Sequence, residues 1–137
     1  ERRGTCPRKR GLLEGEAASQ HTQQALADIY ARWEAGDFDA RVDEGESIVE
    51  VQARALRAYR RVLAEQAGRT ALIVAHGRLL RVLLASILPG YGLARMHDIQ
   101  HANTSVNRIV VDDDGRVCAD VLNCTAHLEA PTSTLVE

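Results

Sequence analysis

The spacing of apolar residues predicts that the N-terminal third of the chain contains an amphipathic helix. Between residues 16 and 34 the large apolar side chains recur every three or four positions, with polar side chains between them. This spacing places them on one face of a helix, which is the pattern of a helix packed on a core. The residues on that face are Leu26, Ile29, Tyr30 and Trp33.

A second helix has a clear start signal in the sequence. Ser47 is followed three positions later by Glu50, the pattern of a capping box in which each side chain satisfies a backbone amide of the first turn. Gly68 is expected to end this helix. Its predicted buried stripe consists of Ile48, Val51, Ala55, Tyr59, Val62 and Leu63.

A continuous apolar run follows and leads directly into a third helix. Thr70–Ala75 is apolar after its first residue, which predicts a parallel strand buried on both faces. Arg78–Leu88 is apolar almost all round and stops before Pro89, so it predicts a buried helix. His76 and Gly77 lie between the two elements.

The C-terminal third is predicted to contain an antiparallel hairpin. Residues 91–104 have no clear period apart from one helical turn around Leu93–Asp98. Residues 105–111 and 117–123 are strand-like and flank a tight Asp-Gly turn. Helix, strand, helix and hairpin together predict an α/β fold with a mixed sheet flanked by helices.

The length of 137 residues fits one domain with a substantial core. We expect a basic extended arm at residues 1–10, an α/β domain at residues 11–126 and a C-terminal tail at residues 127–137. The arm carries five basic side chains and could contact RNA or an acidic partner, although a solvated terminus is the simpler interpretation.

Composition narrows the class of protein further. The formal net charge of -2 gives no general attraction to nucleic acid. No apolar run has the length of a membrane span, and no signal peptide is evident. Three cysteines at spacings that match no zinc site predict free thiols. These observations predict a soluble intracellular protein, in the cytoplasm or in an organelle matrix or stroma.

His76 and Gly77 form the candidate site with the clearest physical basis. Ligands of open α/β sheets bind beyond the carboxyl ends of strands, where helix N-termini present free amides. Gly77 would let a phosphate approach the backbone closely. On spacing alone, however, a histidine at such a position is more often structural than catalytic.

Four segments in order resemble the histidine phosphatase superfamily, which includes phosphoglycerate-mutase-like enzymes. "ALIVAHGRLLRVLLA" resembles its second histidine motif, with an arginine five residues after the histidine, here Arg81. "DEGESIVEVQARA" resembles the preceding Gly-Glu-Ser loop and helix, and "RGLLEGEA" resembles an earlier Glu-Gly loop. "HANTSVNRIVV" resembles the segment in which an asparagine, here Asn103, precedes the closing strand.

The resemblance implies a phosphoglycerate-mutase-like α/β fold that is truncated at its N-terminus. It also implies a phosphate site at His76, Gly77, Arg81 and Asn103, with no cofactor and no metal. The family begins with an Arg-His-Gly motif whose histidine accepts the phosphoryl group, and these 137 residues contain no such motif. Pro7 stands where the family has its acid–base glutamate, and proline cannot transfer a proton. His76 is therefore expected to be a vestigial catalytic residue.

Two functions remain open from the sequence. The first is a degenerate histidine-phosphatase-like domain that serves as a structural or binding subunit of a larger assembly. The alternative is a fragment of an active phosphomonoester phosphatase or mutase whose nucleophilic histidine lies outside this chain. A remote third option is other chemistry through His76 with His97 or His101, two histidines that could share a helix face. A metal pair there lacks a third ligand.

The resemblance also implies that the strand at residues 70–75 needs a neighbour. In the family the first strand of the fold lies beside it, so without that strand its amides and carbonyls would be unpaired. We expect cover from a chain carrying the N-terminal half, from a second copy or from an unrelated protein. A phosphate-containing compound is the expected ligand.

Overall fold

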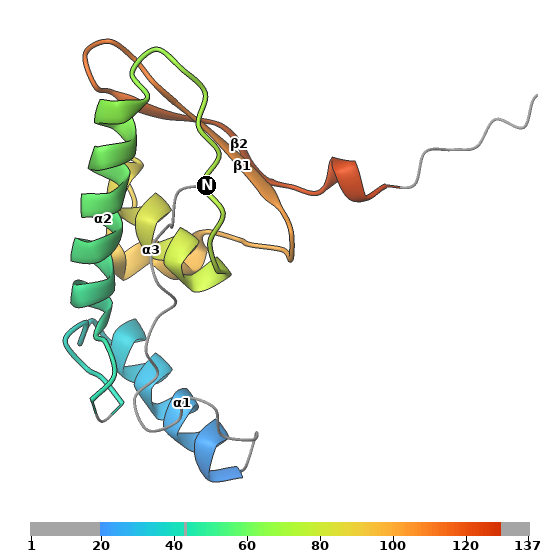
Figure 1. The fold of residues 1–137 in the computed structure, drawn as a ribbon. Coiled ribbons are helices and arrows are strands. Elements are labelled where there is room, and N and C mark those ends of the chain that lie inside the picture. Colours follow the sequence, from blue (N-terminus) through green and yellow to red (C-terminus); the bar gives the residue numbers. More distant parts are fainter. Residues whose placement is uncertain (1–19, 43, 130–137) are drawn as a thin grey trace, which may run out of the picture.

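The computed structural model describes residues 20–42 and 44–129, and it contains helices around a small core with one hairpin on them (Figure 1). The predicted arm at residues 1–10, the "RGLLEGEA" segment and most of the predicted tail lie outside the described residues. The elements are α1 (Gln20–Glu34), α2 (Ile48–Glu65), α3 (Gly77–Ile87), the 3-10 helix η2 (Leu93–Asp98), β1 (Val106–Val111), β2 (Val117–Cys124) and the 3-10 helix η3 (Ala126–Leu128).

The three α-helices confirm the periodicity of the sequence. α1 buries Ile29 and Trp33, and the Trp33 indole donates a hydrogen bond of 2.8 Å to the backbone oxygen of Ala40. This bond satisfies the polar atom of a buried aromatic side chain. This hydrogen bond therefore holds the polar loop at Ala40 against α1.

The predicted capping box starts α2. The Glu50 amide donates to the Ser47 hydroxyl over 3.3 Å, and the Ser47 amide donates to the Glu50 carboxylate over 2.9 Å. The Ser47 amide and the nearby Arg41 guanidinium lower the pKa of Glu50, because both stabilise its charged form. Of the predicted stripe, Ile48, Val51 and Ala55 are buried.

Ser47→Ala is expected to lower the free energy of unfolding by about 1 kcal/mol, because α2 loses its N-cap acceptor. Ser47 is fully buried, so the Glu50 amide would have no water to replace the lost hydroxyl. Urea denaturation followed by circular dichroism measures the effect. Thr70→Ala removes an exposed hydroxyl and is the control, with an expected change below about 0.5 kcal/mol.

The C-terminal half of α2 is less covered than its stripe predicts. Tyr59 and Val62 are half-buried, and Leu63 is 36% exposed. The Tyr59 hydroxyl is buried and has no hydrogen-bond partner among the described residues. Burial raises the pKa of this hydroxyl. The buried residues of α2 thus lie in its first two turns, from Ile48 to Ala55.

α3 forms the centre of the core, as its largely apolar sequence predicts. Val82, Leu83, Leu84 and Ala85 are all buried. Gln52 of α2 donates a 2.9 Å hydrogen bond to the Ser86 hydroxyl, which in turn donates to the backbone oxygen of Val82. The core cluster also includes Ile29, Trp33, Ala40, Ile48, Val51, Leu88, Met96 and Ile99.

The hairpin confirms the second half of the sheet prediction. β1 and β2 pair antiparallel, and the turn between them closes with Gly115 at a φ of 77°. Positive φ is a conformation that glycine adopts without steric cost. One face of the hairpin packs on the core through Ile109, Val117, Ala119 and Leu122.

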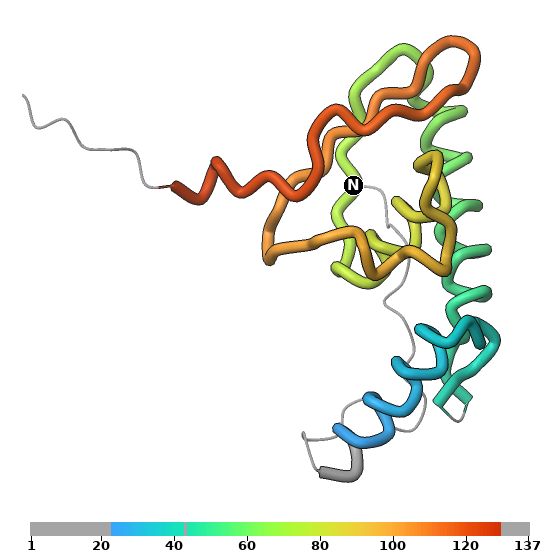
Figure 2. Tube along the Cα trace, turned by 180° about the vertical axis from the view of Figure 1, so that it is seen from behind, coloured from blue at the N-terminus to red at the C-terminus, as the bar shows by residue number. Residues whose placement is uncertain are grey.

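The predicted parallel strand at residues 70–75 is not formed in the described part of the chain. This segment is extended and leads from α2 to α3 past the hairpin (Figures 1 and 2), but its residues belong to no sheet. The sheet of the described residues has two strands, β1 and β2, and is antiparallel. The prediction of a parallel strand at residues 70–75 is therefore wrong for the described part of the chain. A strand also requires a neighbour, and local sequence does not supply one.

The helical turn η3 covers Ala126–Leu128, at the start of the tail expected from residue 127. One smaller prediction is corrected. His97 and His101 do not share a helix, since η2 ends at Asp98 and His101 lies in the loop that follows.

Candidate functional site

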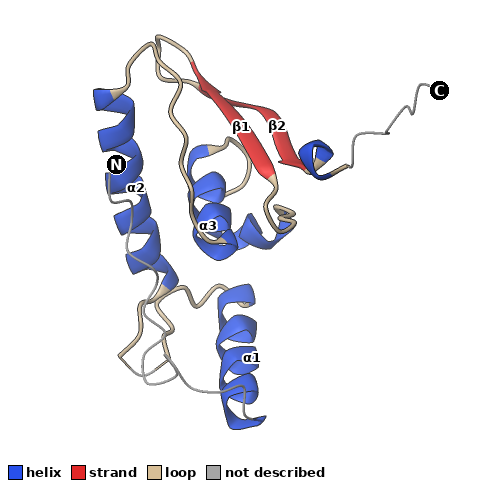
Figure 3. Cartoon of the chain, turned by 45° about the vertical axis from the view of Figure 1, so that its right-hand side comes forward, coloured by secondary structure: helices blue, strands red, loops and turns tan. Residues whose placement is uncertain are grey.

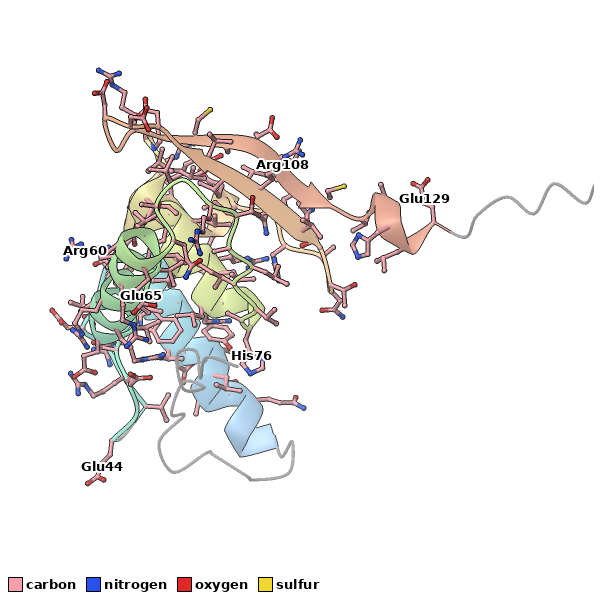
Figure 4. All side chains as sticks on the ribbon, turned by 45° about the horizontal axis from the view of Figure 1, so that its top comes forward. Glu44, Arg60, Glu65, His76, Arg108 and Glu129 are labelled. Carbon is pink, nitrogen blue, oxygen red and sulfur yellow. The ribbon has the colours of Figure 1, made fainter. Side chains whose placement is uncertain are left out.

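The candidate site is the N-terminus of α3. Gly77 is the first residue of α3, as the sequence predicts, and His76 is its N-cap residue with extended backbone angles of φ -76° and ψ 149°. The His76 side chain makes no capping hydrogen bond to the helix. It is exposed at the end of the extended segment, well away from Arg108 on the hairpin (Figure 4). Its ring is therefore accessible to a ligand.

Gly77 is in close contact with a second histidine that the sequence analysis did not place at this site. A Cβ atom at position 77 would lie 2.5 Å from His101 Cδ2 and 3.0 Å from His101 Nε2. These separations are shorter than van der Waals contact. Glycine is therefore required here so that the imidazole of His101 can pack on the start of α3.

Polar contacts hold the His101 loop in place. The Ser105 hydroxyl lies 3.3 Å from His101 Nδ1. Of the two ring nitrogens, Nε2 is the one that faces Gly77. The Asn123 carboxamide accepts a 2.7 Å hydrogen bond from the Ala102 amide. The Asn123 amide donates over 2.9 Å to the side chain of Asn107. The hairpin thus fixes the loop that carries His101.

Arg81 lies one helical turn after Gly77, on the same face of α3. Its Nε atom is buried and has no hydrogen-bond partner among the described residues. A buried donor without an acceptor costs free energy. An anion that reached this face of α3 could therefore accept a hydrogen bond from Arg81 Nε. His76, Gly77 and Arg81 thus all lie within the N-cap and the first five residues of α3.

Asn103 is not joined to this group by any contact in the described structure. It lies in the loop after His101, and its side chain is exposed. Its backbone oxygen accepts a 2.7 Å hydrogen bond from the Thr104 hydroxyl. The predicted role of Asn103 as a phosphate ligand remains a prediction.

Arg78, the second residue of α3, has a structural role that the sequence analysis missed. Its guanidinium lies 3.7 Å from the centre of the Tyr30 ring and 5.3 Å from that of Trp33. Arginine stacks favourably on aromatic faces. The contact joins α1 to the start of α3, two helices that Figure 3 labels, and Tyr30 and Trp33 lie three positions apart on one face of α1 with ring centres 5.5 Å apart.

The described residues contain no metal site, no paired cysteines and no membrane-spanning helix. No group of three or more histidine, cysteine or acidic side chains there could hold a metal ion. Cys118 and Cys124 are free thiols, as predicted, while Cys6 lies outside the described residues. No helix in the described part of the chain is both long and apolar enough to cross a membrane.

Comparisons with known proteins identify the family and the fold. A family model described as histidine phosphatase superfamily (branch 1) matches residues 8–124. The solved structure of Bacillus stearothermophilus YhfR is similar, with a TM-score of 0.75 and 29% sequence identity over 89% of this chain. The match covers 59% of YhfR, so this chain spans less than two thirds of that protein. No match was found among curated proteins.

Proposed function

Because the chain belongs to the histidine phosphatase superfamily, we propose that it is a degenerate phosphate-binding domain and serves as a structural or binding subunit of a larger assembly. The observation that carries the proposal is the exposed His76 ring at the N-terminus of α3, with Gly77 next to it in sequence and Arg81 one helical turn after Gly77. Free amides at a helix N-terminus and a guanidinium attract a phosphate group. The ligand class is a phosphate-containing small molecule, and binding needs no cofactor.

The lack of a second catalytic histidine argues for binding without turnover. In this chemistry an imidazole attacks phosphorus while cationic groups stabilise the charge on the equatorial oxygens. These 137 residues contain no Arg-His-Gly sequence, and Pro7 cannot act as an acid or a base. One histidine can bind a phosphate oxygen, but it lacks a proton-transfer partner for cleavage of the ester.

The test is binding and turnover measured on the same preparations. We expect inorganic phosphate to shift the histidine signals in NMR titrations, with affinity reduced about tenfold or more in His76→Ala and in Arg81→Ala, because each loses a charged or polar contact. His127→Ala, at an exposed histidine in η3, is the control and should bind as the parent does. Hydrolysis of p-nitrophenyl phosphate should stay at the buffer rate.

Two results would contradict the proposal. Phosphate binding that survives both substitutions would remove the site from α3. Robust hydrolysis that disappears in His76→Ala would show an active enzyme.

The second function is a fragment of an active phosphomonoester phosphatase or mutase, and it is favoured by one observation: the chain spans 59% of YhfR. Under this reading a further polypeptide supplies the nucleophilic histidine. The intact mass of the natively purified protein separates the two readings, since a larger mass would support the enzyme.

A further inference from the structure

The outer face of α2 carries three exposed arginines, Arg57, Arg60 and Arg61, here called the arginine patch. Residues three and four positions apart are neighbours on a helix surface, so Arg60 and Arg61 both lie beside Arg57. With about 3.6 residues per turn, the buried residues Ile48 and Val51 lie on the other side of the helix. Figure 4 shows Arg60 on the side of α2 that points away from the hairpin. The arginine patch is therefore open to solvent and to a partner.

The arginine patch has no ion-pair partner among the described residues. Other arginines nearby do have one. Arg41 pairs with Glu50 over 3.2 Å, and Arg54 pairs with Glu46 over 2.9 Å. Like charges three or four positions apart destabilise a helix. An anion held between the guanidinium groups of the patch would remove that repulsion, so the patch suits an anionic partner.

Acidic side chains lie at both ends of the arginine patch and limit the length of the partner that fits it. From Arg57 to the last arginine the patch rises by about 6 Å along the helix axis. Glu65 follows in the last turn of α2. A cleft of about 330 Å³ adjoins Arg57 at the other end, and its lining includes three glutamates, Glu44, Glu46 and Glu50. A nucleic-acid strand that ran past the patch would bring its phosphates against these carboxylates, so a short anionic segment fits better.

The side-chain type and the charge of the whole chain favour a local contact with carboxylates. A guanidinium group binds a carboxylate through two parallel hydrogen bonds, a geometry that lysine does not offer. Two or three acidic residues in succession would supply a carboxylate to each arginine of the patch. The chain has a formal net charge of -2, so its attraction for an acidic segment is confined to such a patch.

We propose that the arginine patch docks a short acidic segment of a partner polypeptide, whose carboxylates lie between Arg57 and its two neighbours. The proposal rests on the subunit role proposed above and identifies the surface and the chemistry of the partner. It uses the outer face of α2 and not the N-terminus of α3, so it does not depend on phosphate binding.

The experiment uses a fluorescein-labelled peptide with three successive glutamates between glycine and serine residues. The matched peptide has glutamine in place of glutamate, and fluorescence anisotropy measures the binding of each to the full chain. We expect the acidic peptide to bind at least about tenfold more tightly, because its hydrogen bonds to the guanidinium groups are charge-assisted. Added sodium chloride should weaken its binding, because salt screens exposed charges.

Two double variants with the same change in net charge locate the binding surface. Arg57→Gln with Arg61→Gln is expected to weaken binding of the acidic peptide about tenfold or more, because two charge-assisted contacts are lost. Arg108→Gln with Arg116→Gln removes two exposed arginines from the hairpin instead and should bind as the parent does. Thermal unfolding of the first variant should occur at or above the temperature of the parent, because repulsion along α2 is removed.

Three outcomes would overturn the proposal: no binding of the acidic peptide, equal binding of both peptides, or binding that survives Arg57→Gln with Arg61→Gln. A short oligothymidylate adds a fourth. If it bound more tightly than the acidic peptide and the same variant abolished its binding, the occupant would be nucleic acid. Phosphate titration of this variant should match that of the parent, so failure of the phosphate site and failure of the arginine patch are distinguishable.

Discussion

Replacing Ile48 by alanine is expected to lower the free energy of unfolding by about 2 to 5 kcal/mol, the usual range for truncating a fully buried aliphatic side chain. Ile48 is 0% exposed and lies at the start of α2, in the core cluster with Trp33 and Val82. The substitution removes apolar contacts and leaves a cavity. The helix cannot shift to fill this cavity, because the capping box at Ser47 fixes its first turn. Urea denaturation measures the change.

Leu72→Ala is the matched control for Ile48→Ala. It also truncates a branched aliphatic side chain, but Leu72 is 88% exposed, so the expected change is below about 0.5 kcal/mol. A large loss of stability in Leu72→Ala, or a negligible loss in Ile48→Ala, would contradict the described core. If both substitutions cost several kcal/mol, residues 70–75 would have to be buried.

Gly77→Ala is expected to destabilise the chain by about 1 to 3 kcal/mol, the usual cost of forcing an extra carbon into a packed position. The new Cβ would lie 2.5 Å from His101 Cδ2, so either the ring or the start of α3 must move. The backbone cannot give way easily, because Asn123 and Ser105 hold the His101 loop. Thermal and urea unfolding both measure this effect.

A double variant separates this clash from other effects of the substitution. His101→Ala removes the ring, so in that background Gly77→Ala should be neutral or stabilising, since alanine favours a helix over glycine. The interaction between the two substitutions should exceed about 1 kcal/mol, as is typical of residues in contact. Equal effects of Gly77→Ala in both backgrounds would show that His101 does not require the glycine. Phosphate titration of the same variants reports whether the displaced loop also disturbs the site.

Local sequence was sufficient for the helices and the hairpin. Ser47 and Glu50 define the start of α2 because both partners of the capping box lie within four residues. The hairpin was equally predictable, since Gly115 lies in the short turn that joins its strands. The position of His76 directly before a helix also followed from the pattern alone, because the change from continuous apolar residues to helical spacing is sharp.

The partners of the site residues were not predictable in the same way. His101 lies 24 residues after Gly77, and nothing in the intervening sequence indicates that its ring packs on that glycine. The stacking of Arg78 on Tyr30 likewise joins two elements that are far apart in the chain. Such contacts depend on how the helices and loops pack.

The sequence by itself determined the helices, the hairpin and the location of His76 at the start of α3, since each depends on residues that are close together along the chain. It also determined the family, through four motifs in a fixed order. Only the tertiary structure decided which apolar residues are buried. Ile48 and Leu72 are both aliphatic and both suit a core, yet one is fully buried and the other is exposed. The physical reason is that burial and strand pairing require a second surface. α3 supplies that surface for α2, whereas the described residues supply no paired strand for residues 70–75.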